Sequence, residues 1–337
     1  MSEVATVVAD ARILAIVVAR IGDTLLATPA LRALKALVPK GDLTVLAHPR
    51  RACLLENLSF IDRLSSIDKH SALWRARLPW SRSQLAVVWG HDRALVDYGL
   101  RSAERVVVFD SPGLPDIPRL LRVARPSTPM HAVHERLLLA TAAGAQCEDF
   151  RLAYSPNSAE REHAQRWLAA RGDGHWLGIQ PVSFPTKARR DWPLDKFADL
   201  MQRLAARYPH LHFVILGDAA TAPAAKHLQA ALPDRVVVAA GHFDLRASAA
   251  LIGALDLYIG VDTGPTHIAG ALGIPMVALY HCAYPGRNLM PLDHPALQMI
   301  EHPASGDNPV GAERSMAEIR VEVVEHAARK LLEGERR

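Results

Sequence analysis

The chain has 337 residues, of which 50% are hydrophobic and 22% are charged. A chain of this length and composition suggests about two domains with well-formed cores, and it excludes a disordered protein. The 39 basic and 35 acidic residues leave a net charge of +4, a mild excess that favours anionic ligands or a membrane surface and does not indicate nucleic acid.

Two further features bear on the compartment. Cys53, Cys147 and Cys282 are isolated and form no CxxC pair, which fits a reducing compartment and argues against a disulfide or zinc framework. The longest early apolar run, residues 13–19, is too short to span a bilayer and follows no basic segment. We therefore expect a soluble, cytoplasmic protein.

The amino-terminal part predicts alternating strands and helices. A strand at 13–19, a helix that begins between residues 23 and 29 and ends at Pro39, and a strand at 43–47 form a βαβ unit, which is typical of a parallel sheet. Further along, we expect strands at 85–89 and 105–109 and helices at 71–77, 92–100 and 131–143.

The composition changes near residues 151–156, where a turn at 154–157 indicates a linker. A second alternating series follows it. Its expected strands are 176–180, 212–216, 236–239, 257–261 and 276–279, and its expected helices are 159–171, 194–207, 223–232, 245–254, 265–272 and 316–332.

This alternation predicts an α/β protein with two doubly wound, Rossmann-like parallel-sheet domains that face each other across a cleft. We expect an amino-terminal domain at 1–153 and a carboxyl-terminal domain at 154–315. A terminal helical segment at 316–337 completes the chain, and its packing back toward the first domain is left open.

The stretch 257–280 is the most informative part of the sequence. Asp262, Thr263 and Gly264 follow an apolar strand, Pro265 suits the first turn of a helix, and Gly273 with a later proline ends that helix. Ligands of open α/β sheets bind at the carboxyl ends of strands, and a helix start favours phosphate. We predict a seat for a nucleotide diphosphate, with Asp262, Thr263 and His267 directed at it.

A second polar turn follows the first strand, at residues 20–23. Asp23 stands there beside Gly22, where a carboxylate can approach a substrate hydroxyl and act as a general base. An aspartate is also a favoured N-cap residue, so a purely structural role at the start of the helix is an equal alternative.

The loop 180–193 carries Lys187, Arg189 and Arg190 within four positions, between a strand and a helix. Cations at a strand end can neutralise a leaving diphosphate. Taken alone, this cluster is better explained as a solvated basic loop. An NAD-dependent enzyme is disfavoured, because the turn at 20–24 has one glycine in place of GxGxxG, and no Walker-type loop is found.

An aromatic and basic stretch lies at 74–89. It contains Trp74, Trp80 and Trp89, with Arg75, Arg77 and Arg82 among them. The stretch suits an anionic lipid headgroup or an anionic acceptor, and an amphipathic surface helix with a loop explains it at least as well.

Two segments resemble a known family. Residues 21–35 contain Ile-Gly-Asp and Thr-Pro-Ala-Leu-Arg-Ala-Leu-Lys before Pro39, and residues 262–275 contain Asp-Thr-Gly-Pro-Thr-His and Ala-Leu-Gly-Ile-Pro. Both resemble glycosyltransferase family 9, the ADP-heptose:lipopolysaccharide heptosyltransferases. The resemblance extends over residues 12–330, and the second motif is the more specific.

The resemblance implies a GT-B fold and an inverting glycosyltransferase that needs no metal and no cofactor. The donor would be ADP-L-glycero-D-manno-heptose, held mainly by the carboxyl-terminal domain. The acceptor would be a Kdo or heptose hydroxyl of the lipopolysaccharide inner core on its lipid A anchor. Peripheral contact with the cytoplasmic face of the inner membrane is left open.

The resemblance also implies roles for single residues. Asp23 matches the catalytic base, and Arg20 and Gly22 beside it are expected to contact the acceptor. The expected donor-binding residues are Ser183, Thr186, Lys187, Arg190, Phe243, Asp262, Thr263, Gly264 and His267. Phe243 stands where the family places an apolar residue against the adenine.

The sequence departs from the family at three places. Arg190 replaces the lysine two positions before Trp192, residues 281–285 replace Gly-Pro-Thr-Asp-Pro, and Asp218 is the nearest acid where a ribose-binding glutamate is missing. Two alternatives therefore stay open. One is an enzyme of the same fold that uses another nucleotide sugar or acceptor, such as a capsule or protein glycan. The other is a catalytically silent sugar-nucleotide-binding protein.

Overall fold

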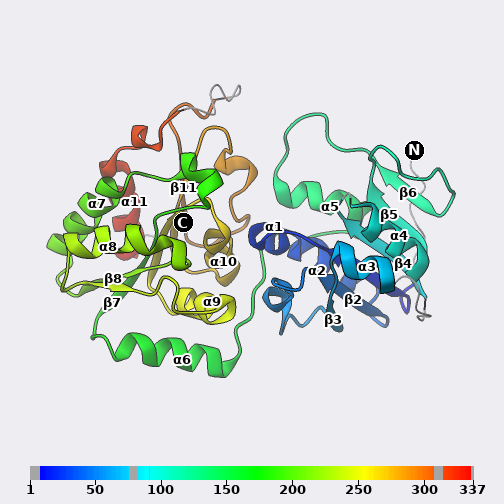
Figure 1. The fold of residues 1–337 in the computed structure, drawn as a ribbon, viewed down its shortest axis with the longest axis horizontal. Helices are drawn as coiled ribbons and strands as arrows, with labels where there is room; N and C mark the ends of the chain where they lie inside the picture. Colours follow the sequence, from blue (N-terminus) through cyan, green and yellow to red (C-terminus); the bar gives the residue numbers. More distant parts are fainter. Residues whose placement is uncertain (1–7, 76–81, 91, 307–313, 335–337) are drawn as a thin grey trace. The chain divides into compact units, whose positions relative to one another are not determined.

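A computed structural model of the chain describes residues 8–75, 82–90, 92–306 and 314–334. The chain divides into two compact units, Met1–Ser155 and Pro156–Arg337, a division two residues after the predicted boundary. Each unit is built on one six-stranded sheet with helices on both faces (Figure 1). Within the described ranges, none of the helices combines the length and apolarity that a bilayer crossing needs.

The first unit contains a fully parallel sheet. Its strands are β1 (Arg12–Val17), β2 (Asp42–Ala47), β3 (Arg63–Ser66), β4 (Ser83–Trp89), β5 (Ala103–Phe109) and β6 (Leu120–Val123), in the order β3-β2-β1-β4-β5-β6. The central strands are apolar and buried on both faces, as parallel sheets require. The edge strands β3 and β6 are short and partly exposed, and the hydrophobic pattern did not predict them.

Two groups of helices cover this sheet. α1 (Ile21–Leu26), α2 (Thr28–Leu37) and α5 (Ala132–Ala142) pack together, and α3 (Lys69–Arg75) packs with α4 (Arg93–Ser102). Alternate residues of the central strands, such as Leu14 and Ile16 of β1, join the α3–α4 core. Their neighbours point to the opposite face, because successive side chains alternate along a strand.

The helix predicted to begin between residues 23 and 29 is α2, which begins at Thr28, and the short helix α1 before it was not predicted. α1 begins at Ile21, and a turn at Ala27 separates it from α2. Pro29 has no N–H to donate to the carbonyl of Leu25, and the Thr28 hydroxyl donates to that carbonyl instead, at 2.6 Å. The break therefore follows from Thr28-Pro29 and leaves α1 as a separate turn at the end of β1.

The second unit repeats the topology of the first. Its parallel strands are β7 (His175–Gln180), β8 (Leu211–Ile215), β9 (Val236–Val238), β10 (Leu257–Val261), β11 (Met276–Tyr280) and β12 (Leu297–Glu301), in the order β12-β11-β10-β7-β8-β9. Numbered within its own unit, each sheet has the Rossmann order 3-2-1-4-5-6. The strand order reverses between β1 and β4 in one unit and between β7 and β10 in the other, so these are the switch points.

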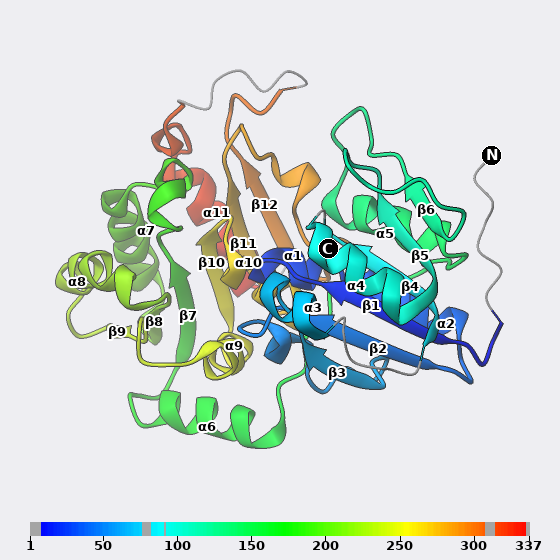
Figure 2. The same cartoon turned by 45° about the vertical axis from the view of Figure 1, so that its right-hand side comes forward.

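The helices of the second unit also form two groups (Figure 2). α6 (Ser158–Ala169), α9 (Leu245–Gly253) and α10 (Gly264–Leu272) pack in series. α7 (Leu194–Arg207) packs against α8 (Ala222–Ala231) and α11 (Val321–Leu332). The core on the α7 side includes the fully buried Trp192, Phe197 and Phe213. As predicted, α10 ends at Gly273, which adopts the left-handed conformation with φ 69°.

The last helix was predicted at 316–332, and the structure interrupts it. A 3-10 turn, Met316–Glu318, is followed by extended backbone at Ile319, and α11 begins at Val321. The Ile319 carbonyl accepts hydrogen bonds from Trp192 Nε1 at 3.0 Å and from Lys196 Nζ at 3.1 Å. These two tertiary hydrogen bonds take the place of the bond that the Ile319 carbonyl would accept within a continuous helix. α11 packs on β10, β11, β12 and α7, and its return toward the first unit stays a prediction.

His294, in the loop before β12, makes the stability of this unit depend on pH. Burial lowers its pKa from 6.5 to about 4. The unfolded chain therefore takes up a proton near pH 6.5 that the folded chain takes up only near pH 4. The contribution of neutral His294 to the free energy of unfolding is therefore complete above pH 6.5. About 3 kcal/mol of that free energy should be lost as the pH falls from 6.5 to 4.

We expect His294→Asn to remove this part of the pH dependence of urea unfolding. The asparagine keeps an acceptor for the Ala296 N–H, which His294 Nδ1 accepts at 3.1 Å. His210 is exposed, so His210→Asn serves as the control, and its free energy of unfolding should depend on pH as that of the wild type does. Equal slopes for wild type and His294→Asn would show that His294 does not carry the effect.

Candidate functional site

The strongest candidate site lies at the switch point of the second unit. β7 and β10 are adjacent parallel strands, so the loops that follow them leave the same edge of the sheet. One loop carries a 3-10 turn at Pro185–Arg190, and the other carries Asp262 and Thr263 before α10. Ligands of doubly wound sheets bind in this position. Two segments about seventy residues apart thus meet where the sequence predicted a diphosphate seat.

A buried ion pair joins the two loops. Arg190 Nη1 donates to Asp262 Oδ2 at 2.6 Å, and the side chains of Arg190 and Asp262 are 14% and 5% exposed. His267 Nε2 lies 3.6 Å from the other carboxylate oxygen. A carboxylate removed from water needs such a partner, because its desolvation is costly. Arg190 is therefore not part of a solvated basic surface, which was the alternative for this loop.

Several buried polar atoms around this pair have no partner within the described residues. They are Arg190 Nε, His267 Nδ1, Gln180 Oε1 and Tyr280 OH. Gln180 ends β7 and Tyr280 ends β11, so these atoms come from the same edge of the sheet. Buried polar groups are nearly always hydrogen-bonded in native proteins, so this cluster is suited to a polar ligand.

Tyr280 and Gln180 were not among the predicted site residues. Both end apolar strands and look like core residues in a hydrophobic pattern. Burial, and next the negative charge of Asp262, hold the pKa of Tyr280 well above its ordinary value, so the phenol stays neutral. Its hydroxyl can then donate a hydrogen bond at any physiological pH.

A hydroxyl network beneath the site fixes the start of α10 against β10. Thr266 Oγ1 donates to the Val261 carbonyl at 2.5 Å and lies 2.9 Å from the Tyr258 hydroxyl. Because the threonine proton is engaged, Tyr258 donates to Thr266. Burial strongly raises the pKa of Tyr258, which keeps that proton in place. Thr266 and Tyr258 therefore position Thr263 and Gly264 at the helix start.

The basic loop is held together by its own residues. The Ser183 N–H donates to Asp191 at 2.7 Å, and the Ser183 hydroxyl donates to the Lys187 carbonyl at 2.8 Å. Ser183 therefore anchors the loop, and Thr186 lies exposed within it. Lys187 is half-buried, with Nζ 5.1 Å from the centre of the Tyr284 ring. Burial raises the pKa of Asp191.

Phe243 lies between β9 and α9, and its ring contacts belong to α6. It packs edge-on against Trp167, with ring centres 5.3 Å apart, and near His163 at 6.1 Å. Asp218 caps the following 3-10 turn by accepting from the Ala220 N–H. Phe243, the predicted adenine-binding residue, therefore follows β9, and Asp218, the acid nearest to the missing ribose-binding glutamate, follows β8. Neither residue takes part in the hydrogen bond between Arg190 and Asp262.

In the first unit, Asp23 lies in the first turn of α1 at the β1–β4 switch point. The N-cap residue of α1 is Arg20, so the alternative that Asp23 caps the helix is wrong. Arg136 of α5 donates to the Asp23 carboxylate at 2.5 Å and to its backbone carbonyl at 3.2 Å. The Asp23 side chain is still 44% exposed, so a substrate hydroxyl can reach it.

Arg136 escaped sequence analysis because nothing in its local sequence marks it. It lies 113 positions from Asp23 and reaches it only because α5 packs against α1. Trp89, at the end of β4, donates from Nε1 to the Arg136 carbonyl at 3.0 Å. Arg20 is exposed, and Gly22 lies beside Asp23 in the same turn.

A family model, glycosyltransferase family 9 (heptosyltransferase), matches residues 116–304, more than half of the chain. The chain belongs to this family. The matched range contains the Arg190–Asp262 pair, while Asp23 lies before it. The protein is therefore a glycosyltransferase of the heptosyltransferase family. No curated protein sequence matches it.

Solved structures show the same fold. A family 9 glycosyltransferase from Veillonella parvula has a TM-score of 0.80 at 20% identity, over 96% of this chain and 98% of that one. E. coli ADP-heptose LPS heptosyltransferase II has a TM-score of 0.77 at 20% identity, over 96% of this chain and 99% of that one. E. coli heptosyltransferase WaaC with ADP has a TM-score of 0.71 at 15% identity, over 95% of this chain and 99% of that one. The glycosyltransferase thus has the GT-B fold that the resemblance implied.

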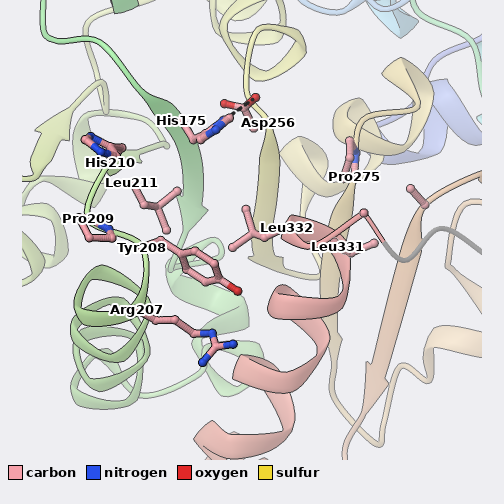
Figure 3. Close-up of a pocket in the computed structure, with 12 residues that line it drawn as sticks. His175, Arg207, Tyr208, Pro209, His210, Leu211, Asp256, Pro275, Leu331 and Leu332 are labelled. Atoms are coloured by element: carbon pink, nitrogen blue, oxygen red, sulfur yellow. Dashed lines mark ion pairs between the residues drawn. The ribbon is translucent and has the colours of Figure 1, made fainter.

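A separate cavity of about 400 Å³ lies at the opposite edge of the second sheet (Figure 3). It is lined by residues at the amino ends of β7, β8, β10 and β11 and by the end of α11, among them His175, Asp256, Pro275 and Leu331. None of the predicted donor residues lines it. Of its polar groups, His175 lies 3.4 Å from Asp256, and Arg207 and Tyr208 both bind Glu333 of the segment after α11.

We expect Thr266→Val to destabilise the glycosyltransferase by about 1–3 kcal/mol, because it removes the acceptor of the Tyr258 hydroxyl in the core and leaves the Val261 carbonyl with only the longer bond from the Thr263 hydroxyl, at 3.3 Å. Thr266→Ser keeps the hydroxyl and is the matched control. Denaturant unfolding measures both. A valine variant as stable as wild type would show that these hydrogen bonds do not hold α10 in place.

Proposed function

We propose that this glycosyltransferase moves heptose from ADP-L-glycero-D-manno-heptose to a Kdo or heptose hydroxyl of the lipopolysaccharide inner core, with inversion and without a metal. The observation that carries the proposal is the buried Arg190–Asp262–His267 cluster with its unpartnered polar atoms, at a switch point in a heptosyltransferase-family chain. The structures of heptosyltransferase II and of WaaC with ADP support an adenine nucleotide donor.

In this proposal the second unit holds the donor. The N-terminus of α10, formed by Gly264 after Thr263, presents free N–H groups to the diphosphate. Arg190 and Lys187 neutralise the charge that grows as the sugar–phosphate bond breaks. Phe243 would meet the adenine, and Ser183 and Thr186 belong to the loop that would contact the phosphates.

Asp23 of the first unit is the proposed base. It removes the proton from the acceptor hydroxyl, whose oxygen attacks the anomeric carbon while the bond to the diphosphate breaks and ADP leaves. One displacement inverts the anomeric configuration. Arg136 donates one hydrogen bond to the carboxylate and one to the backbone carbonyl of Asp23, and so fixes the direction of the side chain. Arg20 and Gly22 are proposed to contact the acceptor.

Action at the cytoplasmic face of the inner membrane is part of the proposal. Of the aromatic stretch, Trp89 is buried in the core, Trp74 is 55% exposed beside the exposed Leu73, and Trp80 and Arg77 lie outside the described residues. Trp74 and Leu73 on α3 therefore support a peripheral contact with lipid A-bearing membrane, and Trp89 does not.

The alternative with a specific observation behind it is a family member with another donor sugar or acceptor. The loop 281–285 departs from the family motif, and it leaves the carboxyl end of β11 beside the proposed donor site. A purely sugar-nucleotide-binding role finds less support, because Asp23 is present, oriented and exposed.

The donor assignment is tested by calorimetry and by a transfer assay. We expect ADP-heptose to bind more tightly than UDP- or GDP-sugars, and transfer to an inner-core acceptor to persist in EDTA. Tighter binding of a UDP- or GDP-sugar would exclude ADP-heptose as the donor. Complete loss of transfer activity in EDTA would exclude metal independence. Mass spectrometry of lipopolysaccharide from a strain lacking the protein identifies the acceptor by its truncation point.

We expect Asp23→Asn to lower turnover by roughly 10²–10⁴-fold while donor affinity stays unchanged, because a general base contributes to the chemical step and not to donor binding. Asp97→Asn is the matched control, since Asp97 also pairs with an arginine of the same unit, at 2.8 Å. Unchanged transfer by Asp23→Asn would exclude Asp23 as the base.

A further inference from the structure

The loop 281–285 after β11 forms a fixed platform beside the ion pair. The buried His281 accepts the Ala283 N–H at Nδ1, at 3.0 Å, so its Nε2 carries the proton and donates to the Arg314 carbonyl at 2.7 Å. Burial lowers the pKa of His281, which keeps this neutral form. The Tyr284 N–H donates to the His281 carbonyl at 2.9 Å and closes the turn. Tyr284 is thereby held in one position.

The ring of Tyr284 meets all three cations of the basic loop. The Arg190 guanidinium lies 3.6 Å from the ring centre, Lys187 Nζ lies at 5.1 Å and the Arg189 guanidinium at 5.4 Å. Arg189 also donates to the Tyr284 hydroxyl at 2.6 Å. Cations are attracted to the face of an aromatic ring, more strongly where water is partly excluded.

The contacts with the Tyr284 ring offset the mutual repulsion of the three cations. Three cations within four residues repel one another, and Asp262 directly neutralises only Arg190. The Arg190 guanidinium is held between the carboxylate on one side and the Tyr284 ring on the other. With the ring removed, Arg190 keeps one of these partners, and the orientation of its unpartnered Nε is no longer fixed.

We propose that Tyr284 is a positioning residue, which fixes the Arg190 guanidinium against Asp262 and so sets the geometry in which the loop binds the diphosphate of the donor. This inference rests on the proposed function only in taking a nucleoside diphosphate as the ligand. It gives a role to a residue of the loop that departs from the family motif, and it links that departure to the arginine at position 190.

The test is a double-mutant cycle on ADP binding, measured by calorimetry with the full chain. Tyr284→Leu removes the ring, and we expect about tenfold weaker binding. Tyr284→Phe keeps the ring and loses the hydroxyl, and we expect a loss of at most about threefold. If the tyrosine acts through Arg190, Tyr284→Leu adds no further loss to Arg190→Ala.

Tyr208→Leu is the matched control. Tyr208 also lies beside an arginine of the second unit, with the Arg207 guanidinium 5.8 Å from its ring centre, and it borders the cavity at the other edge of the sheet. We expect this variant to bind ADP like the wild type. Thermal unfolding of every variant checks that the chain is folded.

A second measurement needs no ligand. Hydrogen bonding from the Arg190 guanidinium, and then from Arg189, lowers the pKa of Tyr284. Ultraviolet titration of the unliganded protein should therefore show an early-ionising tyrosine that Tyr284→Phe abolishes and Arg190→Ala shifts to higher pH. A purely structural tyrosine would not respond to Arg190→Ala.

The outcomes separate this inference from the donor assignment. If the wild type prefers UDP or GDP to ADP, the heptose donor assignment fails, and the same cycle with the preferred nucleotide still tests Tyr284. Unchanged nucleotide affinity in a folded Tyr284→Leu variant, or losses that add to those of Arg190→Ala, would overturn the positioning role. So would a wild type that binds no nucleoside diphosphate.

Discussion

The second unit depends on one buried carboxylate. Asp262 stands at the end of a fully buried strand and is almost inaccessible to water, so its charge has to be balanced by the protein. The balancing cation comes from Arg190, in the loop after β7. This requirement draws the basic loop onto the edge of the sheet, brings it over Tyr284 and aligns it with the start of α10. The polar site is a consequence of compensating that one charge.

The strand order of the two sheets determines the positions of the two candidate sites. Both units have the order 3-2-1-4-5-6, and in both the first and fourth strands are neighbours whose following loops diverge to opposite faces. Asp23 follows the first strand of one sheet, and Arg190 and Asp262 follow the first and fourth strands of the other. The same topological position therefore carries the proposed base in one unit and the proposed diphosphate seat in the other. Each is supported from behind by a packed network, Trp89 with Arg136 and Tyr258 with Thr266.

Errors in the sequence analysis have physical causes that a local pattern does not contain. The short helix α1 was missed, because Thr28 and Pro29 separate it from the predicted helix α2, and Asp23 therefore lies inside a helix instead of at a cap. The last helix is interrupted because Trp192 and Lys196 take the Ile319 carbonyl. The strands β3, β6 and β12 are short, partly polar edge strands, where hydrophobic alternation is weakest.

The sequence by itself determined the α/β alternation, the parallel sheets and the strand-end positions of Asp23, Lys187, Arg190 and Asp262, because hydrophobic runs and the glycine and proline positions are local properties of the chain. Only the tertiary structure decided which of these residues meet. Arg136 reaches Asp23 across 113 positions, Arg190 reaches Asp262 across 72, and Tyr284 meets Arg190 from a third loop. Partners of this kind follow from strand order and helix packing, which bring distant segments to one edge of a sheet, and no spacing in the sequence encodes them.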